Sequence, residues 1–143
     1  MPGGSDTEVV VTNAAIGLPE RVARDVVQSV LRRERRRARI AVTFLGPRAM
    51  RHLNAQFLQH DYATDVIAFP LAGPRGALTG DIYICRYAAA RNARARRTGV
   101  RDELMRLLVH GTLHVLGWEH PEGEARERSP MWRRQEKYLR RPR

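Results

Sequence analysis

One segment in the C-terminal third limits what this chain can fold into. His110 and His114 stand four residues apart in an apolar run, and at this spacing both imidazoles leave the same face of an α-helix. Gly117 is typical of the residue just past a helix end, so we expect the helix to run to about Leu116. A glycine also lets the chain reverse, which would return His120 toward the other two histidines. The segment therefore predicts three imidazoles that converge at one end of a helix.

Convergence of three histidines is typical of a metal site. Catalytic zinc usually keeps three protein ligands and leaves a fourth position open to water or substrate. Three of the 5 histidines in the chain fall within this segment, which favours one zinc ion bound by His110, His114 and His120 over three unrelated core histidines. Gly111 stands where zinc proteases of the HExxH type carry a glutamate general base. The segment therefore does not match that class of peptidase.

The run from His110 to His120 resembles the HGxLHLxGxDH signature of the YbeY family, which consists of bacterial endoribonucleases. Glu119 stands where the family usually has Asp. Shorter matches lie upstream in the family's order and spacing, so that the resemblance spans roughly residues 8–140: Leu53-Asn54, Thr64-Asp65-Val66, Phe69-Pro70, Gly80-Asp81-Ile82 and Ile84-Cys85.

The resemblance implies an enzyme that cleaves RNA. The family acts in ribosomal RNA maturation, including 16S rRNA 3′-end processing, and in ribosome quality control. Its zinc ligands correspond here to His110, His114 and His120. A cleft between helix and sheet suits an unpaired strand better than a duplex, so we expect single-stranded RNA as substrate and the ribosome as partner.

One position departs from the family pattern. The family usually carries an arginine four residues after its Leu-Asn pair, and this chain has Leu58 there. In a helix over 50–58, Arg51 shares a face with Leu58 about 10 Å away, which makes it a candidate for part of the missing guanidinium's role. We expect slow cleavage, because a displaced contact reproduces transition-state geometry poorly. Asp81 is a candidate to orient a histidine or water, or alternatively a helix or turn cap.

The chain is strongly basic. Lys and Arg number 26 against 15 Asp and Glu, which gives a net charge of +11 and an isoelectric point near 11.3, in the range of nucleic-acid-binding proteins. Nearly all of this charge is guanidinium, which can bind phosphate through two hydrogen bonds, although genomic coding bias could also enrich arginine. The Ala- and Arg-rich segment 86–97 is our preferred RNA-binding helix, through Arg86, Arg91 and Arg94. A merely solvated helix face is the alternative.

Apolar periodicity predicts a single α+β domain over residues 1–143, with about four strands in a mixed sheet and about five helices. The expected strands are 7–12, 40–44, 66–71 and 81–85, of which the last two form a hairpin-like antiparallel pair. The expected helices cover roughly 20–37, 50–58, 86–97, 102–116 and 130–139. We expect both faces of the 7–12 strand to be covered, 122–129 to form a loop, and 1–6 and 141–143 to be frayed.

The cysteine count and the N-terminus bear on location. Cys85 is the only cysteine, so the chain cannot form an internal disulfide. The first residues lack the basic-then-apolar pattern of a secretory signal, and no run is long or apolar enough to span a membrane. We therefore expect a cytoplasmic protein.

Two other classes of function stay open. A zinc metallopeptidase would need a general base other than residue 111, because Gly111 has no side chain to accept a proton. An RNA-binding ribosome-assembly factor with a mainly structural metal would carry a fourth protein ligand at the metal.

Overall fold

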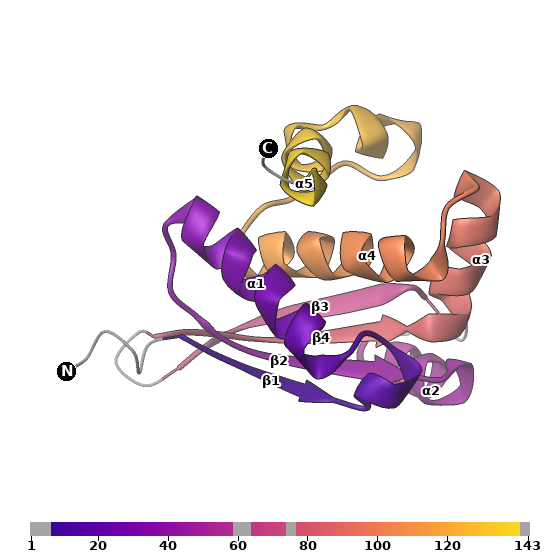
Figure 1. Cartoon of the computed structure of the whole chain (residues 1–143), viewed down its shortest axis with the longest axis horizontal. Coiled ribbons are helices and arrows are strands. Elements are labelled where there is room, and N and C mark those ends of the chain that lie inside the picture. Colours follow the sequence, from indigo (N-terminus) through magenta and orange to yellow (C-terminus); the bar gives the residue numbers. More distant parts are fainter. Residues whose placement is uncertain (1–6, 59–63, 74–76, 141–143) are drawn as a thin grey trace.

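The computed structural model describes residues 7–58, 64–73 and 77–140. Within these ranges the chain forms a four-stranded sheet, five α-helices and two short 3-10 helices in a single domain (Figure 1). The predicted α+β architecture is therefore confirmed. Residues 1–6 and 141–143, which we expected to be frayed, lie outside the described part of the chain.

The sheet combines parallel and antiparallel pairs in the order β1-β2-β4-β3. Its strands are β1 (Glu8–Thr12), β2 (Arg39–Leu45), β3 (Val66–Ala72) and β4 (Leu78–Cys85). β2 is parallel to both β1 and β4, whereas β3 pairs antiparallel with β4. The predicted mixed sheet and the antiparallel pair are confirmed, although β4 begins at Leu78 rather than at Asp81.

β1 is an edge strand with one open face. Val9 is buried in the core, but the next residue, Val10, keeps 50% of its surface exposed. The expectation that both faces of this strand are covered is therefore wrong. A run of β-branched residues indicates strand propensity, and it does not report how many faces the rest of the fold covers.

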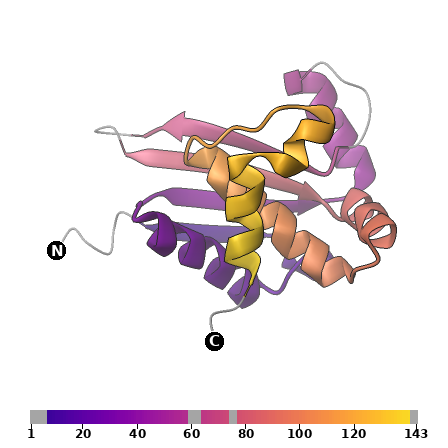
Figure 2. The same ribbon diagram turned by 90° about the horizontal axis from the view of Figure 1, so that it is seen from above.

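The fold of the described residues contains five α-helices, most of which lie against the sheet. α1 and α4 lie on one face, α2 lies at one end of the opposite face, and α5 crosses above α4 (Figures 1 and 2). α3 continues directly from β4 and packs against α4. The bounds are α1 (Glu20–Glu34), α2 (Pro47–Leu58), α3 (Arg86–Arg96), α4 (Val100–Val115) and α5 (Pro130–Leu139), with the 3-10 helices η1 (Ala14–Ile16) and η3 (Gly123–Arg128).

The start of α5 follows its sequence signals. Ser129 is the N-cap, and its Oγ accepts a hydrogen bond from the backbone N–H of Trp132 at 3.2 Å, while Pro130 occupies the first turn. The segment before this cap was predicted as a loop, but it contains the 3-10 helix η3. Its polar composition carries no apolar period, so no helical signal was present there.

α4 lies close against the sheet because glycines occupy the contact. A Cβ atom on Gly111 would lie 2.8 Å from Cγ2 of Ile82, and a Cβ atom on Gly80 would lie 2.5 Å from Cγ1 of Val115. Both distances are too short for a side chain. Residue 111 therefore faces the sheet, and a glutamate there would point into the core. The packing supports the exclusion of an HExxH peptidase.

The helices of the described chain show no membrane-spanning character, since none combines the necessary length and apolar content. Cys85, the only cysteine of the chain, is buried as a free thiol.

Candidate metal centre

Three histidines converge at the C-terminal end of α4. His110 and His114 lie on the helix, and His120 follows the turn after it. Gly117 has a positive φ of 102°, and the backbone N–H of Trp118 donates to a carbonyl in the last turn of α4 at 3.0 Å, which reverses the chain. The three candidate ligand atoms lie within 4.8 Å of one another. The predicted convergence is confirmed.

The same nitrogen of each imidazole is engaged in a hydrogen bond. Each Nδ1–H donates to an oxygen atom: His110 to Oε1 of Gln135 at 2.6 Å, His114 to the carbonyl of Trp118 at 2.9 Å and His120 to the carbonyl of Pro121 at 2.9 Å. Because Nδ1 carries the proton, Nε2 carries the lone pair in each ring, and in His110 this nitrogen lies 3.5 Å from Nη2 of Arg126. Metal-binding histidines usually donate their other N–H in this way. The donor set therefore fits a metal ion bound by three Nε2 atoms.

Burial keeps two of these imidazoles neutral. It lowers the pKa of His110 to about 3, against the raising effect of the hydrogen bond to Gln135, and the nearby charge of Arg126 contributes to the lowering. Burial also lowers the pKa of His114, with a further contribution from His120. Metal ions bind the neutral form of imidazole, so His110 and His114 need lose no proton to act as ligands at neutral pH.

The histidines open into a cavity of about 400 Å³, which we call the metal-site cavity. The start of β3 with the residues before it, 64–69, forms one wall, and Glu122 and Arg126 line another side. Among the described residues, no further histidine, cysteine or carboxylate joins the three histidines as a candidate ligand. Three protein ligands with an open fourth side characterise catalytic rather than structural zinc sites.

A second cavity of about 360 Å³ adjoins the first and is called here the helix-lined cavity. Asp65, His110 and Arg126 line both cavities. α3, α4 and α5 supply most of the remaining wall, including Trp132. The two cavities therefore lie next to each other beside the histidines, with these three residues between them.

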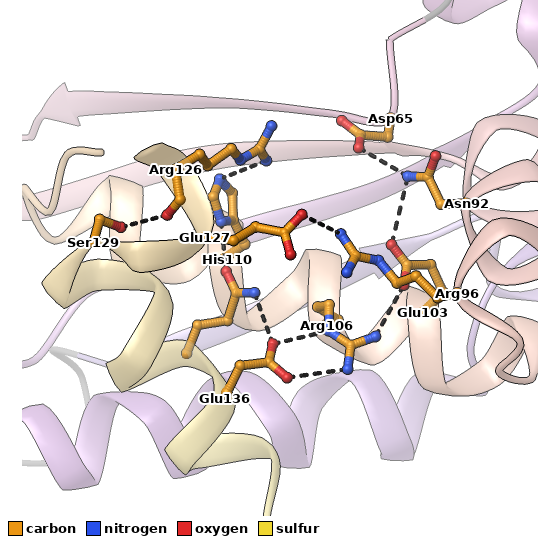
Figure 3. Close-up of polar contacts among 11 residues, drawn as sticks. Asp65, Asn92, Arg96, Glu103, Arg106, His110, Arg126, Glu127, Ser129 and Glu136 are labelled. Atoms are coloured by element: carbon orange, nitrogen blue, oxygen red, sulfur yellow. Dashed lines mark hydrogen bonds and ion pairs between the residues drawn. The ribbon is translucent and has the colours of Figure 1, made fainter. Parts of the chain in front are cut away.

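A chain of polar contacts leads from His110 around the helix-lined cavity (Figure 3). Gln135, which accepts from His110, donates its Nε2–H to Oε2 of Glu136 at 3.0 Å. Glu136 accepts two hydrogen bonds from Arg106, at 2.9 and 3.1 Å. Arg106 also donates to Oε1 of Glu103 at 3.0 Å. The candidate ligand His110 is thus connected to a hydrogen-bond network formed by residues of both α4 and α5.

The same network continues to the start of β3. Glu103 is only 1% exposed, and Arg96 contributes a second cation at 3.5 Å from its carboxylate. The Nδ2 group of Asn92 donates to Glu103 at 3.5 Å and to Asp65 at 3.0 Å. The other carboxylate oxygen of Asp65 accepts from the backbone N–H of Val66 at 2.7 Å. A satisfied polar network of this kind makes the cavity wall rigid.

The turn that leads to His120 is anchored to α1 and α5. The indole N–H of Trp118 donates to Glu34 at 2.8 Å, and Arg134 donates to the other oxygen of Glu34 at 2.8 Å. The Arg134 guanidinium also stacks 4.4 Å from the centroid of the Trp118 ring. Because the carbonyl of Trp118 accepts from His114, this anchor orients a candidate ligand.

The two candidate catalytic residues do not lie at the histidines. Side chains alternate along β4, and because Gly80 and Ile82 face α4, Asp81 points to the opposite face of the sheet. Asp81 is also neither a helix cap nor a turn residue, since it lies within the strand. Arg51 is exposed on α2 and lines neither cavity. Leu58 ends α2, and its side chain lies outside the described part of the structure.

The three candidate RNA-binding arginines lie on α3. Arg86, Arg91 and Arg94 are all exposed to solvent. The guanidinium of Arg91 lies 6.0 Å from the ring centroid of Tyr87, which is itself 54% exposed. This exposure suits both phosphate binding and a solvated helix face, so their contact with RNA stays a prediction.

Three residues that lie near the histidines were not identified from the sequence. Gln135 is fully buried, and no local sequence pattern reveals its pairing with His110, 25 residues away. Asp65 belongs to the segment Thr64-Asp65-Val66, which matches the family pattern. This match was the signal that could have identified it. Arg126 lies in the polar segment predicted as a loop, and its sequence neighbours give no sign that it differs from them.

The hydrogen bond from His110 to Gln135 can be tested by Gln135→Leu. We expect metal affinity to fall about 10- to 100-fold, because His110 loses the acceptor that fixes its ring orientation. Competition with a chelator measures the affinity, and circular dichroism verifies the fold. Lys137→Leu, at an exposed position of the same helix, is the control and should bind metal normally. Equal affinity in both variants would show that Gln135 does not position the ligand.

Comparison with known proteins places the chain among RNA-cleaving enzymes. The family model described as Endoribonuclease YbeY matches residues 11–143. The Endoribonuclease YbeY of Chlorobium luteolum is 39% identical over 114 residues, covering 79% of this chain and 81% of that protein. That of Chlorobium phaeovibrioides is 36% identical over 124 residues, covering 86% and 82% respectively.

A solved structure agrees with the fold. The solution structure of a Thermotoga maritima protein superposes with a TM-score of 0.62 at 25% sequence identity, covering 92% of this chain and 86% of that one. The family model spans nearly the whole chain and includes the histidine segment, so this chain belongs to the YbeY family of endoribonucleases.

Proposed function

We propose that this endoribonuclease uses one zinc ion to cleave single-stranded RNA in the cytoplasm. Its proposed role is ribosomal RNA processing, including 16S rRNA 3′-end maturation, and ribosome quality control, with the ribosome as partner. One observation carries the proposal: three imidazoles, with their Nδ1–H groups bound to oxygen atoms, turn Nε2 lone pairs toward an open cavity. Three neutral nitrogen ligands are a donor set suited to zinc.

The histidines would hold the metal, and the chain would supply the rest of the site. A zinc ion bound there supplies a Lewis acid that acts on phosphoryl groups at neutral pH. His110 is kept in place by Gln135, and His114 by the carbonyl of Trp118, so the ligand geometry is set before substrate arrives. The metal-site cavity, at about 400 Å³, has the size of a small-ligand site, which suits one unstacked nucleotide.

The substrate would approach over α3. This helix contributes Asn92 and Arg96 to the helix-lined cavity, and its exposed arginines Arg86, Arg91 and Arg94 extend the positive charge outward. Guanidinium groups at these positions would contact the phosphates of an unpaired strand.

The proposal is tested by incubating zinc-loaded protein with a single-stranded RNA, the same RNA as a duplex, and casein. We expect the single strand to be cut, the duplex to be cut far more slowly, and casein to stay intact, with a chelator stopping the reaction. A precursor of 16S rRNA within the small ribosomal subunit extends the test to the proposed biological substrate. Intact RNA together with full zinc occupancy would favour an RNA-binding assembly factor, and digestion of casein would favour a peptidase.

A further inference from the structure

Arg126 brings a guanidinium group to the histidine cluster. Its Nη2 lies 3.5 Å from Nε2 of His110, the lone-pair nitrogen that faces the metal-site cavity (Figure 3). The side chain reaches this position from η3 and lines both cavities. Arg126 is therefore positioned where the two cavities meet.

The surroundings of Arg126 leave its charge unmatched. Arg96, Arg106 and Arg134 lie in the same part of the molecule, and each of them pairs with a glutamate. Within the described ranges, Arg126 forms no ion pair, and its Nε–H is buried without a hydrogen-bond acceptor. A buried donor without an acceptor costs free energy in the folded state and is uncommon in native proteins. An anionic ligand would satisfy both the charge and the donor.

Hydrogen bonds fix the backbone that carries this side chain. The carbonyl of Arg126 accepts hydrogen bonds from both the backbone N–H of Ser129, at 3.2 Å, and its Oγ, at 2.7 Å. Ser129 also caps α5, so the end of η3 is fixed to the start of a packed helix. The backbone from which the guanidinium extends is thus fixed before any ligand binds, which favours the preorganisation that electrostatic stabilisation requires.

A metal ion at the histidines would place a second positive charge beside Arg126. Two cations this close repel each other unless an anion binds between them. A phosphodiester suits this position, because its oxygens can contact the metal on one side and accept the paired N–H groups of a guanidinium on the other.

We propose that Arg126 binds the scissile phosphate of the RNA substrate beside the metal ion. The inference rests on the proposed function for the identity of the substrate, but phosphate binding by Arg126 can be measured independently of cleavage. The proposed function and the proposed role of Arg126 can therefore fail separately.

The first test measures the binding of inorganic phosphate to zinc-loaded protein by isothermal titration calorimetry. We expect Arg126→Gln to weaken binding at least about tenfold, because a charge-assisted contact is lost. Arg128→Gln is the matched control, since it removes the same charge from the same 3-10 helix at an exposed position that lines neither cavity. Zinc content is measured for every variant. Equal phosphate affinity in Arg126→Gln and the natural protein overturns the proposal, as does the absence of phosphate binding by the natural protein.

The second test measures single-turnover cleavage of single-stranded RNA. Arg126→Gln should lower the rate about 100-fold or more with zinc content and RNA affinity nearly unchanged. Arg126→Lys should recover part of the rate, because it restores the charge without the fork geometry. If the natural protein cleaves no RNA, the proposed function fails and the phosphate titration still decides the role of Arg126. If Arg126→Gln does not fold, Arg126→Met takes its place in the titration, because it also removes the charge, and unchanged phosphate affinity in that variant overturns the proposal.

Discussion

His120→Ala is expected to leave the purified protein without bound metal, against about one ion per chain in the natural protein. His120 lies outside α4, so its replacement removes one of the three ligands while the helix that carries the other two stays intact. Two imidazoles alone bind zinc far more weakly than three. Mass spectrometry of the dialysed protein measures the metal, and cleavage of single-stranded RNA should disappear together with it.

The control for this change is His52→Ala. His52 is exposed on α2 and lines neither cavity, so the same chemical change there should leave metal content and cleavage unaltered. Full metal occupancy in His120→Ala would mean that the turn after α4 does not supply the third ligand.

RNA affinity is expected to fall steeply with salt. A single strand loses about 0.7 in log affinity per phosphate contact for each tenfold rise in salt, so about five contacts give roughly 100-fold weaker binding between 50 and 200 mM. Replacing Arg86, Arg91 and Arg94 together with Gln should lower the affinity at low salt and flatten this dependence, because three candidate contacts on α3 are removed. Fluorescence anisotropy with a labelled single-stranded RNA, measured at several salt concentrations, gives both quantities.

A second triple variant separates a specific surface from net charge. Arg21, Arg32 and Arg35 are exposed on α1 and at its C-terminal end, and they line neither cavity. Their replacement with Gln removes the same charge and should change the salt slope much less. Equal effects in the two triple variants would contradict a binding face on α3.

The convergence of the three candidate metal ligands could be predicted from the sequence because their geometry is local. A four-residue spacing on a helix fixes His110 relative to His114, and one glycine at the helix end determines the reversal toward His120. α4 ends at Val115 and Gly117 has the expected positive φ, so the short-range signals agreed with the fold.

The surroundings of the ligands depend on distant packing, and the sequence could not reveal them. Gln135 and Arg126 reach His110 only after α5 has packed against α4 and η3 against α5. Asp81 differs from these two residues, because a family-like motif singled it out in the sequence. The motif did not show on which face of the sheet its side chain lies. Strand alternation decides that face, and it places Asp81 away from the histidines.

The hydrogen bond between His110 and Gln135 also ties the metal centre to the stability of α5. A metal ion that binds only the folded arrangement stabilises it by mass action, and part of this stabilisation reaches α5 because Gln135 holds a ligand in place. Local opening in proteins begins where the fewest contacts must be broken. A chain deprived of metal should therefore open more readily at α5 than the metal-bound chain does, although the ion pairs of Glu136 with Arg106 and of Arg134 with Glu34 remain. The availability of the metal would then control how long the helix-lined cavity keeps its shape, and hence whether a newly made molecule is ready to receive RNA.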